Sequence, residues 1–264
     1  MLIIKRGEGS DNLQQEIENI IQNFIVDYQN RDDIKSEWKE PVIKYAAADD
    51  PMFKKLKEAV SEEHLLPEDI LSDAETVIAY FLPFSEEIAN SNIEGKYSSH
   101  QWAVAYIETN QLIAELNQHL KNKLAARGYK AGLIAATNNF DKERLLSDWS
   151  HRHAAYIAGL GTFGLNNLLI TEKGCAGRIG TLVTDLKIEA SERSEKERCL
   201  NKAGFNCSKC VERCINGSLQ EDSFDRHLCY ELLTENDKIH PESALTDVCG
   251  KCSVDLPCSF SSPL

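Results

Sequence analysis

The chain has 264 residues, a formal net charge of −13 and an apolar content of 42%, which is ordinary for a globular protein. Its length allows one large folded domain or two smaller ones. Nucleic-acid binding depends mainly on Lys and Arg side chains that neutralise phosphates, so an acidic chain without a basic block makes DNA or RNA an unlikely partner.

The amino-terminal stretch lacks the apolar run and the small-residue cleavage site of a signal peptide. No apolar stretch approaches the roughly 18 residues that are needed to cross a bilayer. We therefore expect a soluble, cytoplasmic protein without a membrane partner.

The spacing of apolar residues predicts a mixed helix-and-sheet layer structure over residues 1–185. The strongest strand signal is TVIAYFL at 76–82, which is continuously apolar and is followed by Pro83. Gly128 is well placed to end the long helix that is predicted over 99–127. In chain order, the predicted elements are a helix over 10–30, a strand over 42–47, a helix over 51–60, a strand over 76–82, a helix over 99–127, a strand over 129–136, a helix over 141–158, and strands over 168–171 and 179–184.

The composition changes after Asp185. A highly charged stretch, KIEASERSEKER, covers 187–198 and reads as an exposed linker or a solvated helix. Cysteine-rich loops are expected after it. We therefore expect two domains, residues 1–187 and residues 188–264.

Nine cysteines in a chain without an export signal call for an explanation other than disulfides. Cys175 stands alone and reads as a free thiol. The other eight follow the spacing Cys199-x7-Cys207-x2-Cys210-x3-Cys214, then Cys229, then Cys249-x2-Cys252-x5-Cys258.

The cysteine spacing favours iron–sulfur clusters. The bacterial ferredoxin run is C-x2-C-x2-C-x3-C-P, and its fourth cysteine binds the other cluster. Cys207, Cys210 and Cys214 match the second to fourth positions of that run, and an insertion separates Cys199 from them. Two four-thiolate zinc sites are the alternative, since zinc also takes four cysteines.

Five further segments of the chain are informative: DAETVIAYFLPF at 73–84, KYSSH at 96–100, AGLGTFGLNNLLI at 158–170, GRIGTLVTD at 177–185 and RHLCYELLTE at 226–235. Together with the cysteine pattern, they resemble one family of proteins, the epoxyqueuosine reductases. The resemblance covers about residues 70–260, and the glycine-rich segment AGLGTFGLNNLLI is similar to the cobalamin segment of that family.

The resemblance implies an α+β fold, in which a nitroreductase-like α/β domain holds a cobalamin and precedes a ferredoxin-like domain with two 4Fe-4S clusters. Reductive dehalogenases share this layout. It further implies two crossed sets of ligands, Cys199, Cys207, Cys210 and Cys258 for one cluster, and Cys214, Cys229, Cys249 and Cys252 for the other.

The resemblance also points to residues that would contact the cofactor. Glycines after a helix permit positive φ and a close approach of backbone to ligand, although a simple helix stop and turn would use them in the same way. The expected contacts are Tyr97, His100, Gly159, Gly161, Thr162, Phe163, Gly164 and Asn166.

The catalytic acid of the family lies in an Asp-x-x-Pro-type segment about thirteen residues before AGLG, and here that register falls near Leu145. Asp148, Arg152 and Tyr156 are the alternative candidates for proton delivery or substrate binding, because Arg152 and Tyr156 are four residues apart on a predicted helix. A solvated helix face with one core aromatic residue explains the same pattern.

Two functions remain open from the sequence. The first is a cobalamin-dependent reductase that receives electrons from a ferredoxin-type or flavodoxin-type protein and reduces a small molecule. The second is an electron-transfer protein or reductive activator for a partner, for example a corrinoid protein, without a tightly held cobalamin. Queuosine modification of tRNA is a third hypothesis, which rests on fold resemblance alone.

Overall fold

The computed structural model describes residues 10–135, 140–240 and 244–264. Its helices are α1 (Ser10–Gln29), α2 (Pro51–Ala59), α3 (Pro67–Ile70), α4 (Glu86–Ser91), α5 (His100–Ala125), α6 (His151–Ile157), α7 (Lys209–Glu212), α8 (Arg226–Asp237) and the 3₁₀-helix η1 (Lys251–Ser253). Its strands are β1 (Val42–Ala47), β2 (Thr76–Pro83), β3 (Ala131–Leu133), β4 (Phe140–Asp141), β5 (Leu146–Ser147), β6 (Gly161–Phe163), β7 (Leu169–Thr171) and β8 (Gly177–Thr184).

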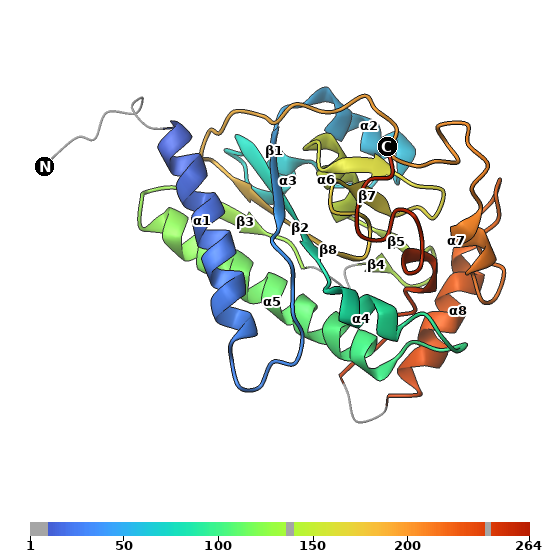
Figure 1. The fold of residues 1–264 in the computed structure, drawn as a ribbon. Coiled ribbons are helices and arrows are strands. Elements are labelled where there is room, and N and C mark those ends of the chain that lie inside the picture. Colours follow the sequence, from blue (N-terminus) through green and yellow to red (C-terminus); the bar gives the residue numbers. More distant parts are fainter. Residues whose placement is uncertain (1–9, 136–139, 241–243) are drawn as a thin grey trace, which may run out of the picture.

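A four-stranded antiparallel sheet with the order β1-β2-β8-β3 forms the centre of the molecule (Figure 1). Every residue of β2 is buried, which explains why its sequence is continuously apolar. Its side chains alternate between two cores. Ile78 and Tyr80 pack toward α1 and α5, whereas Val77 and Phe81 pack toward α2 and α6.

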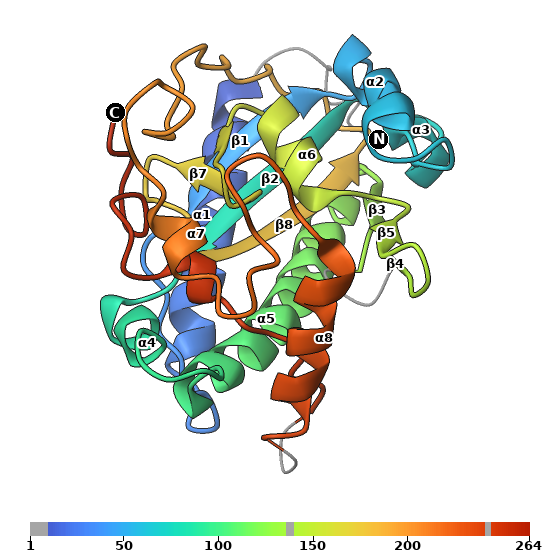
Figure 2. The ribbon, with the colours of Figure 1, turned by 90° about the vertical axis from the view of Figure 1, so that its right-hand side faces the viewer.

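The helices cover both faces of this sheet (Figures 1 and 2). The side chain of Ser99 caps α5 by accepting a hydrogen bond from the backbone N–H of Trp102. Gly128 follows α5 with φ of +84°, as expected of a glycine that ends a helix. The predicted helices at 10–30, 51–60 and 99–127 and the predicted strands at 42–47 and 76–82 are therefore confirmed within one or two residues.

The predicted helix over 141–158 is wrong in its first half. Residues 140–147 form the small hairpin β4–β5, and α6 begins only at His151. The carboxylate of Asp141 accepts hydrogen bonds from the backbone N–H groups of Glu143 and Arg144, which turns the chain instead of starting a helix. The predicted strand over 129–136 is shorter, as β3 ends at Leu133, and its last predicted position lies outside the described residues.

The carboxy-terminal segment lies against the sheet-and-helix unit (Figure 2). Val254 is fully buried in the same core as Trp102 of α5. The charged stretch 187–198 is not helical, and Ser191 binds the backbone of Tyr45 through its N–H and its hydroxyl group. The expectation of loops alone after this stretch is also wrong, since α8 carries Cys229.

Within the described ranges, no helix combines the length and the apolar character that crossing a membrane requires.

Candidate cluster sites and an adjoining cavity

Three cysteines that are close in sequence and a fourth from the carboxy-terminal loop line one small cavity, together with the apolar side chains of Leu165, Leu200 and Leu256. We call them the first cysteine group: Cys199, Cys207, Cys210 and Cys258. Cys210 lies on α7, and Cys258 lies in the carboxy-terminal loop. Burial, and then the neighbouring thiols of Cys258 and Cys199, raise the pKa of Cys210 to about 12.

The other four cysteines also influence one another. We call them the second cysteine group: Cys214, Cys229, Cys249 and Cys252. Burial raises the pKa of Cys252, and the three other thiols of the group raise it further. Burial, and then the neighbouring thiol of Cys249, raise the pKa of Cys229 to about 11. Four of the eight clustered cysteines thus line one cavity, and the other four influence one another electrostatically.

The surroundings of both groups fit a cluster chemically. Thiolates are the ligands that iron–sulfur clusters take. The buried indole Nε1 of Trp102 has no hydrogen-bond partner among the residues that the structure describes, and this ring packs against Gly250 between two cysteines of the second group. A buried N–H donor beside sulfur ligands suits a cluster, whose sulfurs accept hydrogen bonds. Among the described residues, no three His, Cys, Asp or Glu side chains are arranged to hold a single metal ion.

Cys175 is buried beside the first cysteine group without belonging to it. Its backbone N–H donates to the carbonyl oxygen of Cys258 at 3.0 Å. Its thiol is hydrogen-bonded to the sulfur of Cys258, which raises the pKa of Cys175 and lowers that of Cys258. Cys258 is therefore the better thiolate of this pair, and Cys175 supports it.

A cavity of about 380 Å³ adjoins the cysteines, and Cys175 lies in its wall. We call it the arginine cavity, because Arg152 and Arg178 both line it. Arg152 donates to the carbonyl oxygen of Asn167 at 2.6 Å, and Arg178 donates to the side-chain oxygen of Asn110 at 2.7 Å. These acceptors are neutral, so neither positive charge is cancelled by a carboxylate of the described residues.

Loss of solvation lowers the pKa of Arg152, although its side chain keeps exposed surface. The loss of solvation and the exposed surface of Arg152 are consistent if that surface faces the cavity, where protein atoms surround the side chain. Among the nearby charges, Cys252 and Cys229 raise this pKa and Arg178 lowers it. Cys229 and Cys252 of the second cysteine group are thus close enough to the arginine cavity to influence Arg152 electrostatically.

His151 closes one side of the cavity through a chain of hydrogen bonds. Trp149 Nε1 donates to Thr181 Oγ1 at 3.0 Å, and Thr181 Oγ1 lies 2.8 Å from His151 Nδ1. His151 Nε2 lies 2.9 Å from the carbonyl oxygen of Ala135. A carbonyl only accepts, so Nε2 carries the proton and Nδ1 accepts from Thr181. Burial lowers the pKa of His151 to about 4.

The three predicted catalytic residues do not meet at one site. Arg152 lines the arginine cavity, but Tyr156 lines a separate hollow with Thr162 and Arg198. Asp148 is exposed, and neither cavity includes it among its lining residues. Leu145, at the register of the family's acid, lies in the β4–β5 turn with φ of +52°.

The predicted glycine-rich contacts lie mostly against the protein itself. A Cβ at Gly159 would lie 2.7 Å from the carbonyl oxygen of Glu192, and one at Gly161 would lie 2.1 Å from that of Ile170. At Gly164 the nearest atom would be the side-chain oxygen of Asn166, at 2.6 Å. These three glycines are needed for the packing of the chain, whatever else they contact.

The remaining predicted contacts lie in different places. The hydroxyl group of Thr162 binds the carboxylate of Glu197, and the ring of Phe163 packs against His153. Tyr97 is exposed, and the ring of His100 lies 5.7 Å from that of His240. Neither Tyr97 nor His100 is among the residues that line the arginine cavity.

Sequence reasoning missed Arg178 and Lys251. Arg178 is the charged residue of β8, whose other residues are apolar, glycine or threonine. A single charge in an otherwise uncharged strand could have marked Arg178 as a functional candidate. Lys251 lies between two cysteines of the second group, where a lysine is unremarkable in sequence but is almost completely buried in the structure.

Comparison with known proteins confirms the resemblance that the motifs indicate. No family model matches the chain. An epoxyqueuosine reductase of Listeria monocytogenes is 25% identical over 207 residues, which cover 75% of this chain and 49% of that protein. The chain thus spans about half the length of this relative.

Solved structures share the fold. A crystal structure of an epoxyqueuosine reductase with an epoxyqueuosine-modified tRNA stem loop has a TM-score of 0.62 at 16% identity, and covers 95% of this chain and 66% of that chain. A catabolic reductive dehalogenase has a TM-score of 0.53 at 14% identity, over 91% of this chain and 36% of that chain. The mixed helix-and-sheet fold class is confirmed.

Proposed function

We propose that this protein is an iron–sulfur oxidoreductase that binds two 4Fe-4S clusters and a cobalamin and reduces a small substrate in the arginine cavity. The observation that carries the proposal is the gathering of eight cysteines into two groups of four, one of them beside that cavity. When bound, the clusters supply single electrons and the corrinoid supplies a strongly reducing cobalt. The division into a cobalamin domain, 1–187, and a cluster domain, 188–264, is part of the proposal.

The charges in the cavity favour a negatively charged substrate. Arg152 and Arg178 repel each other, as the lowering of the pKa of Arg152 by Arg178 reflects, and a bound anion relieves this repulsion. A guanidinium binds a carboxylate or phosphate through paired hydrogen bonds. His151 stays neutral in its fixed tautomer and shapes the cavity without adding charge.

The second function, an electron-transfer protein or reductive activator, is favoured by one observation. Leu145 stands where the family's catalytic acid is expected, and Asp148 faces solvent. In this alternative the same cysteine groups would serve a partner such as a corrinoid protein. An electron donor of the ferredoxin or flavodoxin type is needed in both cases.

Modification of tRNA remains the third hypothesis. A neighbour of the same fold was solved with a tRNA stem loop, which speaks for a nucleic-acid substrate in that protein. The net charge of −13 speaks against one here.

Anaerobic purification tests the proposal. Protein supplied with iron, sulfide and cobalamin should retain about eight iron atoms per chain, as two four-thiolate clusters require, and corrin absorption should survive gel filtration. Cys210→Ser and Cys229→Ser should each lose about half of the iron, whereas Cys175→Ser, the matched control, should keep it.

Each outcome decides between the hypotheses. Clusters without retained corrinoid would favour the electron-transfer alternative. Zinc in place of iron, without acid-labile sulfide, would overturn both.

A separate experiment tests the class of substrate. Arg178→Gln should weaken turnover of an anionic substrate much more than turnover of its neutral ester or amide.

A further inference from the structure

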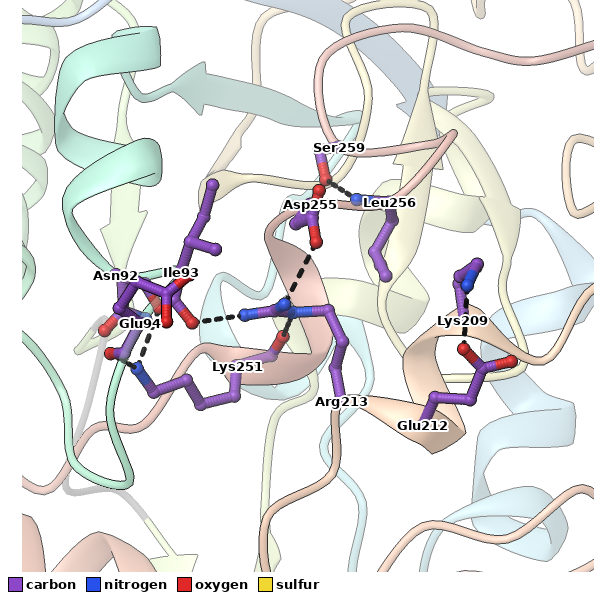
Figure 3. A network of polar contacts seen from close by, with 10 residues as sticks. All are labelled: Asn92, Ile93, Glu94, Lys209, Glu212, Arg213, Lys251, Asp255, Leu256 and Ser259. Atoms are coloured by element: carbon purple, nitrogen blue, oxygen red, sulfur yellow. Dashed lines mark hydrogen bonds and ion pairs between the residues drawn. The ribbon is translucent and has the colours of Figure 1, made fainter.

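Two cationic side chains of the carboxy-terminal segment point at the same short loop after α4 (Figure 3). Lys251 lies between Cys249 and Cys252, and Arg213 immediately precedes Cys214. Both cationic residues are therefore sequence neighbours of cysteines in the second cysteine group. Three successive carbonyl groups, those of Asn92, Ile93 and Glu94, accept their hydrogen bonds.

Lys251 is the more unusual of the two, because its side chain is only 1% exposed. Its Nζ donates to the carbonyl oxygens of Asn92 at 2.8 Å and Glu94 at 2.7 Å. Both acceptors are neutral, and no carboxylate of the described residues forms an ion pair with this ammonium group. A buried charge without a counter-charge costs several kcal/mol, so an opposite charge is expected nearby.

Arg213 is compensated, and Lys251 is not. Arg213 Nη1 pairs with the carboxylate of Asp255 at 3.1 Å, while Nη2 binds the carbonyl oxygen of Ile93 at 2.6 Å. Lys251 stands two residues after Cys249 and directly before Cys252, so the second cysteine group is the source of negative charge beside it in the chain.

The first cysteine group has a lysine at the corresponding place but a different environment. Lys209 directly precedes Cys210, just as Lys251 directly precedes Cys252. Lys209 is exposed, and Glu212 neutralises it across 2.8 Å (Figure 3). Solvent and this carboxylate screen its charge, whereas the charge of Lys251 acts through the protein interior.

We infer that Lys251 is the built-in counter-charge of the cluster held by the second cysteine group and raises the reduction potential of that cluster. The inference rests on the proposed presence of two clusters. A cluster with four thiolate ligands gains one negative charge on reduction, and a nearby buried cation stabilises the reduced form. Lys209 has no comparable effect on the other cluster.

The test is a redox titration of the anaerobic protein with both clusters, followed by electron paramagnetic resonance. Lys251→Gln keeps a donor for the loop carbonyls but removes the charge. It should weaken electron binding by one cluster about tenfold, a lowering of its potential by about 59 mV for a one-electron couple. Lys251→Arg keeps the charge and should stay near the parent protein, and Lys209→Gln should move neither potential appreciably.

Iron content is measured first, so that the two proposals fail separately. A parent protein without clusters overturns the proposed function and this inference with it. Two clusters with unchanged potentials in Lys251→Gln, or an equal shift in Lys209→Gln, overturn only the role of Lys251. If Lys251→Gln loses the second cluster while Lys251→Arg keeps it with the parent potential, the need for the charge is supported.

Discussion

The side-chain amide of Asn166 donates a hydrogen bond of 2.8 Å to the carbonyl oxygen of Cys252. This bond joins the loop between β6 and β7 to a loop of the second cysteine group, 86 residues further along the chain. Asn166 is buried, and its side-chain oxygen also accepts the backbone N–H of Leu168. One side chain thus couples the glycine-rich segment to the candidate cluster site.

Asn166→Ala should lower the free energy of unfolding by about 1–3 kcal/mol, because it leaves a partly buried carbonyl and a partly buried N–H without these partners. Urea denaturation of the anaerobic protein measures the change. Asn167→Gly is the matched control: Asn167 has φ of +58°, which glycine adopts freely, so this variant should unfold at the parent urea concentration or higher. Equal losses in both variants would contradict the role of the Asn166 hydrogen bond.

Gly250→Ala should prevent the second cluster from assembling. Gly250 has φ of +71°, and a Cβ there would lie 2.3 Å from the ring of Trp102. Gly128 has φ of +84° with open space around it, so Gly128→Ala suffers only the backbone strain of about 1–2 kcal/mol. Iron analysis should therefore show about half the iron in Gly250→Ala and the full amount in Gly128→Ala. Full iron in both variants would show that the Trp102 ring can move to make room for the added methyl group.

The half-buried His151 of the arginine cavity should make stability depend on pH. The pKa of His151 is lowered to about 4 by burial, so below pH 6.5 the unfolded chain takes up a proton that the folded chain refuses. Stability is therefore lost as the pH falls from about 6.5 toward 4. Between pH 7 and 5, the parent should lose about 1 kcal/mol more than His151→Gln, since solvent in the cavity screens part of the effect.

The difference between parent and variant is the measured quantity, because cluster lability and the other histidines affect both proteins alike. His227→Gln, at an exposed histidine, is the control and should follow the parent over the same pH range. Parallel curves for the parent and His151→Gln would show that His151 does not carry the effect.

Thr181→Val should uncouple Trp149 from His151. The hydroxyl group of Thr181 accepts from the indole and donates to the imidazole, and valine of similar shape does neither. The expected loss is about 1–3 kcal/mol in the free energy of unfolding, since a buried indole N–H is orphaned. In a Trp149→Phe background the same substitution should cost at least about 0.5 kcal/mol less. Additive losses would exclude this hydrogen-bond chain as the coupling.

The sequence alone was sufficient for the long elements, and its cysteine spacing was enough to propose the cluster ligands. Helices α1 and α5 follow from the helical spacing of their apolar residues, because one face of each helix is buried. Strand β2 follows from its continuously apolar sequence, because both of its faces are buried. The cysteine spacing was equally informative, since a cluster needs four thiolates and short gaps bring neighbouring ones together. These features depend on chemistry that is local in the chain.

Tertiary structure decided the rest. The sequence of residues 141–150 predicts a helix, but in the structure the carboxylate of Asp141 accepts hydrogen bonds from the backbone of a turn. Arg152 and Tyr156 share a helix but line different cavities. Lys251 and its acceptor Asn92 are 159 residues apart, so no local pattern predicts the burial of this charge. Burial and solvation depend on all the neighbours that folding brings together, and these are what set the charge and chemistry of a site.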